Sequence, residues 1–411
     1  MPHKNLLVIG GGAAGIFCAV NAKRLNPSLQ VMVLEKTGKL LSKVRISGGG
    51  RCNITHACFD ADEMSRRYPR GRSFVRKAFH RFFTRDTIQW FEDRGVKLKT
   101  EADGRMFPVT DSSQTVIDCL LREAEKLGVK IRMKSEVCSV QLREAVFLVE
   151  LADEQVFTAD FLCIACGGYP KTGLFDWIVK TGHDIEEPVP SLFTFNMPGH
   201  PLTGLMGVSV PDTKVKIAGT KTEQRGPVLI THWGLSGPAI LRLSAWGARE
   251  LAAMQWQFAI RVNWLPEWNE QSLSSQFQSL RYDRAAQPVS GKNPFGLPQR
   301  LWEFFADASG IKEGTRWSDL PAKAQNRLIR HLCDSEFDIR GKTTFKEEFV
   351  TAGGIRLSQV DPNTMMSKRM PGLFFAGEVM DVDGITGGYN FQHAWTSGFI
   401  AGKSIAVLAQ P

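Results

Sequence analysis

The sequence predicts an α/β fold in which a nucleotide-binding domain is interrupted by an inserted region of β-strands and helices. Two observations near the ends of the chain predict the domain. A Gly-rich turn joins an apolar run to a helix within residues 5–24, and a second apolar run enters a Gly-acid turn at residues 371–378. A third observation predicts the insertion: 411 residues exceed one small core, and short β-like runs fill much of the stretch between the ends.

The first nucleotide-binding unit begins at the amino terminus. Asn5–Ile9 is a short apolar run, Gly10–Gly15 fits the pattern G-x-G-x-x-G, and Ile16–Arg24 continues at the helical period. Leu29–Leu34 predicts a second strand, which ends at Glu35. A glycine pattern between strand and helix, followed at this spacing by an acid, predicts dinucleotide binding in a Rossmann-like βαβ unit.

Each residue of this turn has a mechanical role. Gly10 permits the tight turn, Gly12 lets a pyrophosphate approach the backbone, and Gly15 lets helix and strand pack closely. The start of the helix presents unpaired amides and the positive end of a dipole to the phosphates. Glu35 is placed to accept a hydrogen bond from a ribose hydroxyl.

The other end of the chain favours FAD over NAD as the nucleotide. Pro371–Glu378 predicts a strand that runs into a Gly-acid turn, and Gly387–Asn390 opens a helix. A helix that starts beside a flavin stabilises negative charge on the reduced ring. Between the two ends, Ala159–Gly168 predicts a third strand that finishes in a small-Gly-Gly turn.

Several motifs resemble those of one known family. They are Ser47–Thr55 (SGGGRCNIT), Gly104–Pro108 (GRMFP), Thr231–Pro238 (THWGLSGP), and Gly377–Asp381 (GEVMD) with Gly387–Asn390 (GGYN). In these motifs and their order, the chain resembles the BaiN/YhiN-type FAD-dependent oxidoreductases, or aminoacetone-oxidase-like flavoproteins. The resemblance implies an α/β, Rossmann-like FAD-binding domain of the two-dinucleotide-binding-domain flavoprotein type, interrupted by an inserted β-rich plus helical region on the substrate side.

The resemblance and the glycine pattern together assign the expected FAD contacts. One position departs from the family, because Cys166 stands where these proteins more often have Thr, although a small side chain is kept. No second G-x-G-x-x-G of comparable context occurs, so NAD(P)H is expected only as a transient electron donor at the flavin face. The residues expected to bind FAD are Gly10, Gly12, Ala14, Gly15, Glu35, Lys36, Arg51, Cys52, Asn53, Val137, Ala165, Gly167, Gly377, Glu378, Gly387, Gly388, Tyr389 and Asn390.

The positive charge of the chain is concentrated in one segment. Lys36–Arg85 contains thirteen basic and three acidic residues, a net +10, whereas the whole chain carries +9. Aromatic residues alternate with basic ones in its second half, which is typical of surfaces that hold RNA by phosphates and bases. The alternative is a solvated helix face with a core side, and the spacing of Phe79, Phe82 and Phe83 favours the core for those three. The residues expected to contact RNA are Arg66, Arg67, Arg70, Arg72, Arg76, Lys77, Arg81 and Arg85.

Two residues are candidates for catalysis. Cys52 lies beside Arg51, and nearby positive charge would lower the pKa of its thiol and make it a proton donor or redox partner of the flavin. The alternative is a small residue that the loop needs where it passes the cofactor. His232 is a candidate proton carrier, with packing inside its own loop as the alternative. Cys163 and Cys166 form C-x-x-C on a strand, where they face opposite ways, and no Cys/His cluster predicts a metal site.

The chain is expected to comprise four segments. Residues 1–189 form the first part of the FAD-binding domain and residues 350–411 its second part. Between them, residues 190–265 form an inserted β-rich domain. Residues 266–349 form a small helical subdomain, because they include amphipathic runs with helical period.

These features together predict an FAD-dependent oxidoreductase of the cytoplasm. No apolar run approaches the roughly 18 residues of a membrane span, so no membrane partner is expected, and scattered cysteines indicate a reducing compartment. The favoured function is NAD(P)H-supplied reduction of a C=C bond, with uridine in ribosomal RNA as substrate (dihydrouridine formation, an RNA modification). The alternatives are an FAD-dependent oxidase or reductase of a small-molecule amine or enone, and a non-enzymatic FAD-containing RNA-binding factor. The sequence predicts no oligomeric state.

Overall fold

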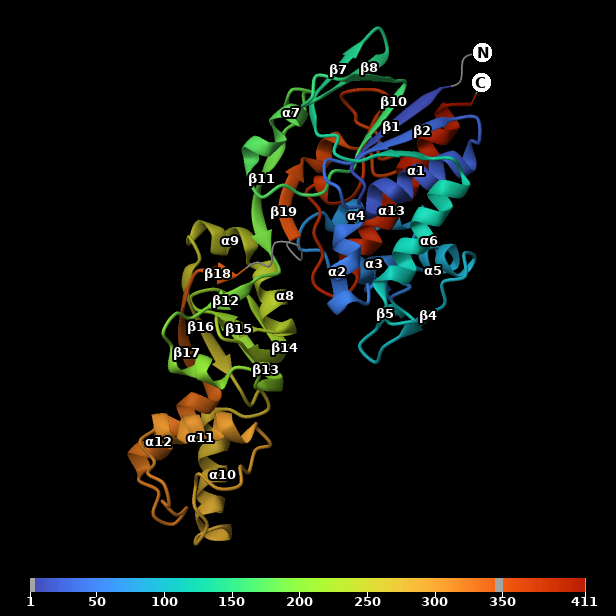
Figure 1. Ribbon diagram of the computed structural model, residues 1–411. Helices are drawn as coiled ribbons and strands as arrows, with labels where there is room; N and C mark the ends of the chain where they lie inside the picture. The colour runs from blue at the N-terminus through green and yellow to red at the C-terminus, as the bar shows by residue number, and fades with distance from the viewer. Residues whose placement is uncertain (1–3, 344–349, 411) are drawn as a thin grey trace. The chain divides into compact units, whose positions relative to one another are not determined.

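A computed structural model describes residues 4–343 and 350–410. The chain divides into two compact units. The first consists of Met1–Ser191 and Phe345–Pro411, and the second of Leu192–Thr344. The second unit is therefore one continuous segment inserted into the first (Figure 1).

The first unit is built on a five-stranded parallel sheet of the predicted Rossmann-like type. Its order is β20–β10–β1–β2–β6, and every neighbouring pair is parallel. In the middle, Leu7 of β1 pairs with Leu162 of β10 on one side and with Met32 of β2 on the other. The turns that follow β1, β10 and β20 consequently lie at one edge of the sheet. The strands are β1 (Asn5–Ile9), β2 (Gln30–Leu34), β6 (Lys130–Arg132), β10 (Phe161–Ile164) and β20 (Leu373–Phe375).

Helices from the two ends of the chain, α1 (Ala13–Leu25) and α13 (Tyr389–Leu408), pack side by side in this unit (Figure 1). Small residues permit the close approach. A Cβ atom at Gly398 would lie 2.6 Å from the carbonyl oxygen of Ala14, and one at Gly402 would lie 2.6 Å from that of Cys18. A larger residue at either glycine would push the helices apart, so the first and last segments form one packed body.

Smaller elements complete the first unit. Ser112 caps helix α6 (Ser113–Lys126) by accepting a hydrogen bond from the Gln114 N–H at 3.3 Å. Strands β11 (Ile185–Ser191) and β19 (Val350–Ile355) pair antiparallel where the chain leaves and re-enters the unit. The other helices and strands are α2 (Ser42–Gly50), β3 (Thr55–His56), α3 (Ala61–Ser65), α4 (Arg72–Phe79), α5 (Thr84–Glu92), β4 (Leu98–Thr100), β5 (Arg105–Pro108), β7 (Val137–Arg143), β8 (Val146–Leu151), β9 (Val156–Ala159) and α7 (Asp176–Val179).

The second unit is an antiparallel seven-stranded sheet with helices around one hydrophobic core. The strand order is β17–β16–β13–β14–β15–β12–β18. One cluster of buried side chains, which includes Trp264, Trp302 and Trp317, joins the sheet to the helices, so the β-rich and helical segments share a core. Among the described residues of the whole chain, no helix is both long and apolar enough to cross a membrane. The elements of this unit are β12 (Thr194–Asn196), β13 (Ser209–Ile217), β14 (Glu223–Ile230), β15 (Gly234–Ser236), α8 (Pro238–Trp246), α9 (Ala248–Ala253), β16 (Gln257–Asn263), α10 (Glu270–Asp283), α11 (Gln299–Ala308), α12 (Ala322–Cys333), β17 (Ser335–Arg340) and β18 (Lys342–Thr343).

Candidate functional site

The turn after β1 shows the close contacts that its glycines predict. At Gly10, φ is +112° and a Cβ atom would lie 2.3 Å from the carbonyl oxygen of Ala165. A Cβ at Gly15 would lie 2.0 Å from the carbonyl oxygen of Gly10, so helix α1 packs directly on the turn. Gly12 differs, because no described part of the chain beyond its neighbours lies within 4 Å of its Cβ position. The backbone at Gly12 is therefore open to a ligand.

The amino terminus of α1 is available to an anion. Gly12 is its N-cap residue, and within the described part of the chain no side chain caps this helix. The first amides of a helix have no partner within the helix, and they lie at the positive end of its dipole. An open backbone beside uncapped amides is the arrangement that binds a pyrophosphate.

Glu35 organises the edge of this turn. One carboxylate oxygen accepts a hydrogen bond from the Gly11 N–H at 2.7 Å, and the other accepts from both the N–H and the hydroxyl of Thr37 at 2.8 Å. The carboxylate thus joins the glycine turn to the loop after β2. The ribose contact expected of Glu35 stays a prediction.

The turns after β10 and β20 lie next to the turn after β1. The Ala165 N–H donates to the carbonyl of Ile9 at 2.8 Å, and the Ala376 N–H donates to that of Ile164 at 3.1 Å. A Cβ at Gly377 would lie 2.7 Å from the Cβ of Ala14 on α1. The three glycine-rich segments found in the sequence therefore border one site at the carboxyl edge of the parallel sheet.

The motif at residues 47–53 is tied to the start of α13. Gly388 is the N-cap of that helix, and none of the described side chains makes a capping hydrogen bond there. With the Asn53 amide placed so that its oxygen faces Gly388, this oxygen accepts from the Gly388 N–H at 2.9 Å and its NH₂ donates to the carbonyl of Thr55 at 2.9 Å. A Cβ at Gly388 would lie 2.6 Å from the Thr55 carbonyl, so only glycine fits there. Asn53 and Gly388 were both expected at the flavin, and the structure brings them together.

Side chains around Tyr389 and Asn390 fix this second helix start. The amide of Asn390 accepts from the Gly384 N–H at 2.8 Å and donates to the Gly384 carbonyl at 2.9 Å. The hydroxyl of Tyr68 donates to the carbonyl of Tyr389 at 2.6 Å. The ring of His56 stacks on that of Tyr389 with centroids 4.9 Å apart. Sequence reasoning missed His56, although it directly follows the SGGGRCNIT motif.

Glu378 connects the turn after β20 to two other segments. Its carboxylate accepts from the Thr351 N–H at 2.8 Å and forms an ion pair with Lys43. The Thr351 hydroxyl is buried without a hydrogen-bond partner among the described residues, and it would lie 2.6 Å from a Cβ at Gly168. Sequence reasoning found Glu378 but missed Lys43 and Thr351, which only the fold brings to it.

Five more residues were expected at FAD, and the structure gives each a different environment. Arg51 pairs with Glu101 at 2.6 Å and its guanidinium lies 4.0 Å from the centre of the Phe107 ring. Lys36 forms an ion pair with Glu136 at 2.7 Å, and Val137, the next residue, is buried at the start of β7. Gly167 follows β10 and has no described neighbour within 4 Å of its Cβ position. Gly387 is packed against the ring of Tyr389.

The expected low pKa of Cys52 is wrong. Cys52 has φ +61° and none of its surface is exposed. Burial raises the pKa of its thiol to about 12, and the hydrogen bond with Ser47 opposes the shift only in part. The adjacent Arg51 does not counter this, because its guanidinium is engaged by Glu101. Cys52 is thus a neutral, fully packed thiol in the loop.

His232, the other catalytic candidate, lies on an exposed turn of the second unit. Its ring lies 4.5 Å from that of Trp233. Thr231 holds the turn, since its hydroxyl accepts from the Trp233 N–H at 3.3 Å and donates to the Gly234 carbonyl at 3.1 Å. The structure therefore shows an exposed imidazole, and its catalytic role stays a prediction.

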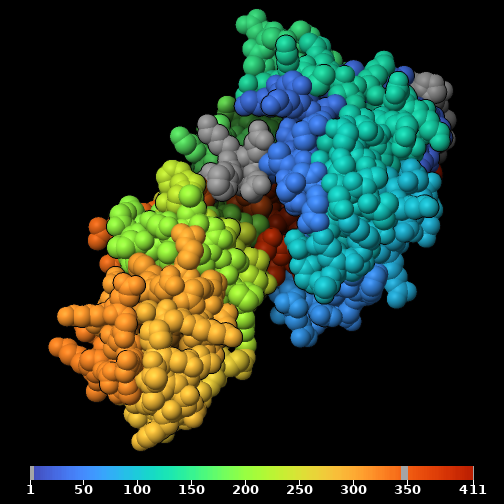
Figure 2. Space-filling view, turned by 60° about the horizontal axis from the view of Figure 1, so that its bottom comes forward, coloured from blue at the N-terminus to red at the C-terminus, as the bar shows by residue number. Residues whose placement is uncertain are grey.

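The basic segment forms an exposed cationic face on and around α4. Mid-blue atoms, which the colour bar places near this segment, form part of the visible surface in Figure 2. Asp62 lies within ion-pair distance of Arg66 (2.7 Å), Arg76 (3.4 Å) and Arg72 (3.7 Å), so one carboxylate serves three guanidinium groups. The residues of this cationic face, all exposed, are Arg66, Arg67, Arg72, Arg76, Lys77, Arg81 and Arg85.

Arg70 was expected on this face, and that expectation is wrong. Only 12% of its side chain is exposed, and its guanidinium makes a bidentate ion pair with Asp383, which is fully buried. Asp383 also accepts a hydrogen bond from Ser191 at 2.9 Å. Arg70 therefore anchors the segment to the loop before α13. Sequence reasoning missed Asp383, although it follows the Gly-acid turn by five residues.

The aromatic residues of this segment were expected to stack on RNA bases, and the structure corrects that expectation. Tyr68, Phe74, Phe79 and Phe82 are buried, and Phe83 is half-buried. On α4 the aromatic residues fall on the core side and the basic residues on the solvent side, as a helical period dictates. The exposed aromatic ring near the basic residues is instead Phe59, 49% exposed, with the guanidinium of Arg85 at 5.4 Å from its centre.

The residues at this sheet edge fit FAD. Two uncapped helix starts, at Gly12 and Gly388, face the site from opposite ends of the chain. Among the residues at positions 4–343 and 350–410, none crowds the Cβ positions of Gly12 and Gly167, and none is a hydrogen-bond partner of the Thr351 hydroxyl. Room and hydrogen-bonding capacity are therefore left for a ligand there. One helix start suits a pyrophosphate, and the other suits the negative charge of a reduced flavin.

Known proteins match this chain over nearly its full length. Residues 4–404 match the family described as HI0933-like protein Rossmann domain. The 3-dehydro-bile acid delta(4,6)-reductase of Clostridium scindens is 30% identical, with 97% of this chain and 98% of that protein covered. The ribosomal RNA dihydrouridine synthase of Escherichia coli is 32% identical, with 98% of each covered.

Solved structures support the fold alone. The 3-ketosteroid-delta4-(5alpha)-dehydrogenase of Rhodococcus jostii has a TM-score of 0.52 at 14% identity, covering 98% of this chain and 97% of that one. The 3-ketosteroid delta1-dehydrogenase of Sterolibacterium denitrificans also has a TM-score of 0.52, at 11% identity, covering 98% and 99%. With the full-length family match and the two curated relatives, this chain belongs to the HI0933-like family and is an FAD-dependent oxidoreductase with a Rossmann-type FAD-binding domain.

Proposed function

We propose that this protein reduces a C=C bond, that its substrate is uridine in ribosomal RNA, and that NAD(P)H supplies the electrons. The names of two full-length relatives support the reaction class, since a delta(4,6)-reductase and a dihydrouridine synthase both add hydrogen across a C=C bond. They act on very different molecules, so the choice of substrate rests on features of this chain.

The observation that carries the RNA substrate is the cationic face around α4. Arg67, Lys77, Arg81 and Arg85 form no ion pair among the described residues, and three more arginines share Asp62. Exposed cations without matching carboxylates attract phosphates and release counterions on binding. This face belongs to the unit that holds the FAD site, and Arg70 links it to the loop before α13.

The flavin site supplies the rest of the proposal. When bound, FAD supplies the hydride for reduction of the C=C bond. The chain's part is to hold the pyrophosphate at Gly12, to place the helix start at Gly388, and to fix both with Glu35 and Asn53. The sheet of the second unit is antiparallel, so the described residues offer no second Rossmann-type domain for NAD(P)H, which supports transient binding.

A small-molecule enone is the second candidate substrate. The Clostridium scindens relative supports it, because that protein is named as a bile acid reductase and its identity and coverage are close to those of the RNA-modifying relative. If the substrate is a small-molecule enone, the cationic face contributes only to the solubility of the protein.

Loss of the gene provides the direct test. Ribosomal RNA from cells with and without the gene is digested and examined by mass spectrometry for dihydrouridine, which is two hydrogens heavier than uridine. We expect one or more dihydrouridine positions to disappear with the gene and to return when unmodified ribosomal RNA is incubated with the holoprotein and NADPH. An unchanged pattern, together with NADPH oxidation driven by an enone, would replace RNA with a small-molecule substrate.

A further inference from the structure

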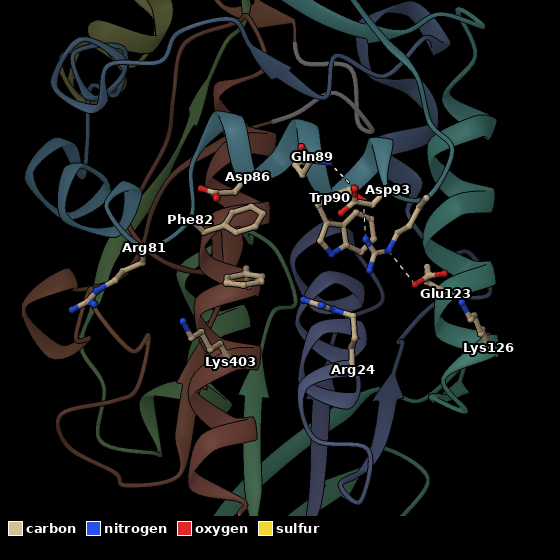
Figure 3. A pocket seen from close by; sticks show the side chains of 12 residues that line it. Arg24, Arg81, Phe82, Asp86, Gln89, Trp90, Asp93, Glu123, Lys126 and Lys403 are labelled. Carbon is tan, nitrogen blue, oxygen red and sulfur yellow. Dashed lines mark hydrogen bonds and ion pairs between the residues drawn. The ribbon is translucent and has the colours of Figure 1, made fainter.

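The first unit contains a surface cleft away from the flavin site. Its volume is about 660 Å³, and it lies among helices α1, α5, α6 and α13. Figure 3 shows Arg24 on α1 and Lys403 on the neighbouring α13, with Phe82 and Trp90 above them in this view. The full lining is Arg24, Arg81, Phe82, Asp86, Gln89, Trp90, Asp93, Arg94, Glu123, Lys126, Phe399 and Lys403.

The cleft is distinct from the FAD site. Lys403 follows Tyr389 by fourteen residues along α13, a distance of about 21 Å at the helical rise. Arg24 follows Gly12 by twelve residues along α1, or about 18 Å. Both helices thus begin at the flavin site and reach the cleft near their other ends, so a ligand of the cleft would not occupy the FAD site.

Four of the five cations in the cleft have no carboxylate partner among the described residues. Arg94 is paired with Glu123 at 3.0 Å. By contrast, the other four cations, Arg24, Arg81, Lys126 and Lys403, form no ion pair with any described residue. Arg24 donates to the side-chain oxygen of Asn21 at 3.4 Å, and Arg81 donates to that of Asn363 at 3.2 Å. Partial burial is the main cause that lowers the pKa of Arg24; the charge of Arg94 adds to it, and the charges of Glu123 and Asp93 oppose it.

The acids of the cleft do not supply the missing partners. Asp86 caps α5 by accepting from the Phe83 N–H at 2.7 Å. Asp93 accepts from the side-chain amide of Gln89 at 2.6 Å, and Glu123 is held by Arg94. Each carboxylate therefore has a hydrogen-bond partner of its own, and the four cations without an ion pair line the cleft together.

Aromatic rings form the remaining wall. Phe82 and Phe399 stack with ring centroids 4.3 Å apart, and Trp90 lies under the guanidinium of Arg94 at 3.9 Å. The cleft has the size of a small-ligand site, which is typically about 300–1,000 Å³. Cations for a phosphate beside aromatic and amide groups for a base form the combination that binds nucleotides.

We propose that this cleft binds a nucleoside phosphate, with Arg24 and Lys403 on the phosphate and the half-buried ring of Phe399, which the buried Phe82 supports, beside the base. The same chemistry is presented by a free nucleotide and by one nucleotide of an RNA strand. Arg81 belongs both to the cleft and to the cationic face, so a strand bound on α4 has a continuous path into it. The proposal goes beyond the proposed function and does not depend on which substrate the flavin reduces.

The test measures binding to the FAD-loaded protein, without turnover. AMP, ATP and a twelve-nucleotide oligouridylate are titrated by calorimetry against wild type, the double variant Arg24→Gln/Lys403→Gln, and the matched control Lys130→Gln/Lys180→Gln. The control residues are exposed, lie in the same unit and form no ion pair among its described residues, so net charge falls equally in both variants. The flavin absorbance spectrum verifies that each variant is folded and loaded.

We expect the cleft variant to weaken binding at least about tenfold and the control to leave it nearly unchanged, since two charge-assisted contacts are lost. Affinity for AMP or ATP would identify a free nucleotide as the ligand, and affinity for the oligouridylate alone would identify an RNA strand. The single variant Lys126→Gln changes an exposed residue of α6 and leaves α1 and α13 unaltered. We expect it to weaken nucleotide binding as well, which provides an independent test of the cleft. Equal binding by wild type and both cleft variants, or no binding of any probe by wild type, would overturn the proposal. Either result leaves the dihydrouridine test unaffected.

Discussion

The thiol of Cys52 is fully buried, and burial raises its pKa to about 12. The basic residue next to Cys52 in the sequence suggested a lowered pKa. A positive charge lowers the pKa of a thiol, however, only when that charge lies close to the thiol and is not neutralised by a carboxylate. Here Arg51 is turned to Glu101 and Phe107. The case shows that adjacency in sequence does not establish electrostatic contact.

Cys52 should consequently resist alkylation in the holoprotein. At pH 8 we expect iodoacetamide to label Cys138, which is exposed, and to leave Cys52 unlabelled because its thiol is neutral and inaccessible. Peptide mass spectrometry after timed labelling measures both sites in one sample. Labelling of Cys52 as fast as Cys138 would show an accessible thiolate and would restore its candidacy as an acid at the flavin.

The ion pair of Arg70 with Asp383 should dominate the local stability of the cationic segment. Substituting Asp383→Asn removes the charge that compensates a guanidinium with 12% exposure. We expect the free energy of unfolding to fall by about 3 kcal/mol or more, because breaking one side of a buried pair leaves a desolvated charge.

Urea denaturation of the holoprotein measures this loss. The control is Glu223→Gln, which breaks an exposed pair with Lys214 and should cost no more than about 1 kcal/mol. Equal effects of the two substitutions would mean that Arg70 finds another partner when Asp383 is neutral.

Helix α4 is amphipathic, with apolar residues on one face and basic residues on the other. Phe74, Val75, Ala78 and Phe79 are buried, whereas the arginines and the lysine between them are exposed. A helical period explains this, and the spacing of the aromatic residues already favoured a core side. The sequence could not show that Asp62, ten residues before Arg72, would return to serve the same arginines.

Asp62 should therefore restrain RNA binding by α4. The variant Asp62→Asn releases Arg66, Arg72 and Arg76 from their shared carboxylate. We expect tighter binding of single-stranded RNA and a steeper dependence of the affinity on salt, because more counterions are released. Fluorescence anisotropy at several salt concentrations measures both quantities.

Charge reversal on the same helix should act in the opposite direction. The triple variant Arg72→Glu/Arg76→Glu/Lys77→Glu should lose RNA affinity and keep FAD, because these exposed residues lie outside the flavin site. The matched control is Lys130→Glu/Arg143→Glu/Lys180→Glu, at exposed positions of the same unit. RNA affinity that is equal in the two triple variants would reduce the cationic face to a solvated surface.

At the scale of the whole molecule, the sequence predicted the elements that carry periodic or glycine-rich patterns. The parallel sheet, α1 and the start of α13 follow from local rules, since strand, turn and helix are neighbours in the chain. Lys43, Thr351 and Asp383 escaped prediction because their partners are 27 to 335 residues away. Such residues become visible only when the fold closes the site.

The second unit should fold on its own, and this prediction follows from how the chain enters and leaves it. Its first and last strands pair with each other, with Thr194 opposite Thr343, so the segment begins and ends at one place. Its buried side chains form a single hydrophobic cluster that spans sheet and helices. Domains inserted through adjacent ends generally keep their structure when excised.

A chain of residues 192–344 should accordingly give a β-rich circular dichroism spectrum and one cooperative thermal transition. It should bind no FAD, because the glycine turns and both uncapped helix starts belong to the first unit. The complementary chain, with residues 1–191 joined to 350–411 by a Gly-Ser linker, should retain FAD, and its flavin absorbance measures this. A noncooperative thermal transition of the excised segment would show that its core depends on the first unit. Loss of FAD by the joined chain would show that the cofactor site includes residues beyond the sheet edge.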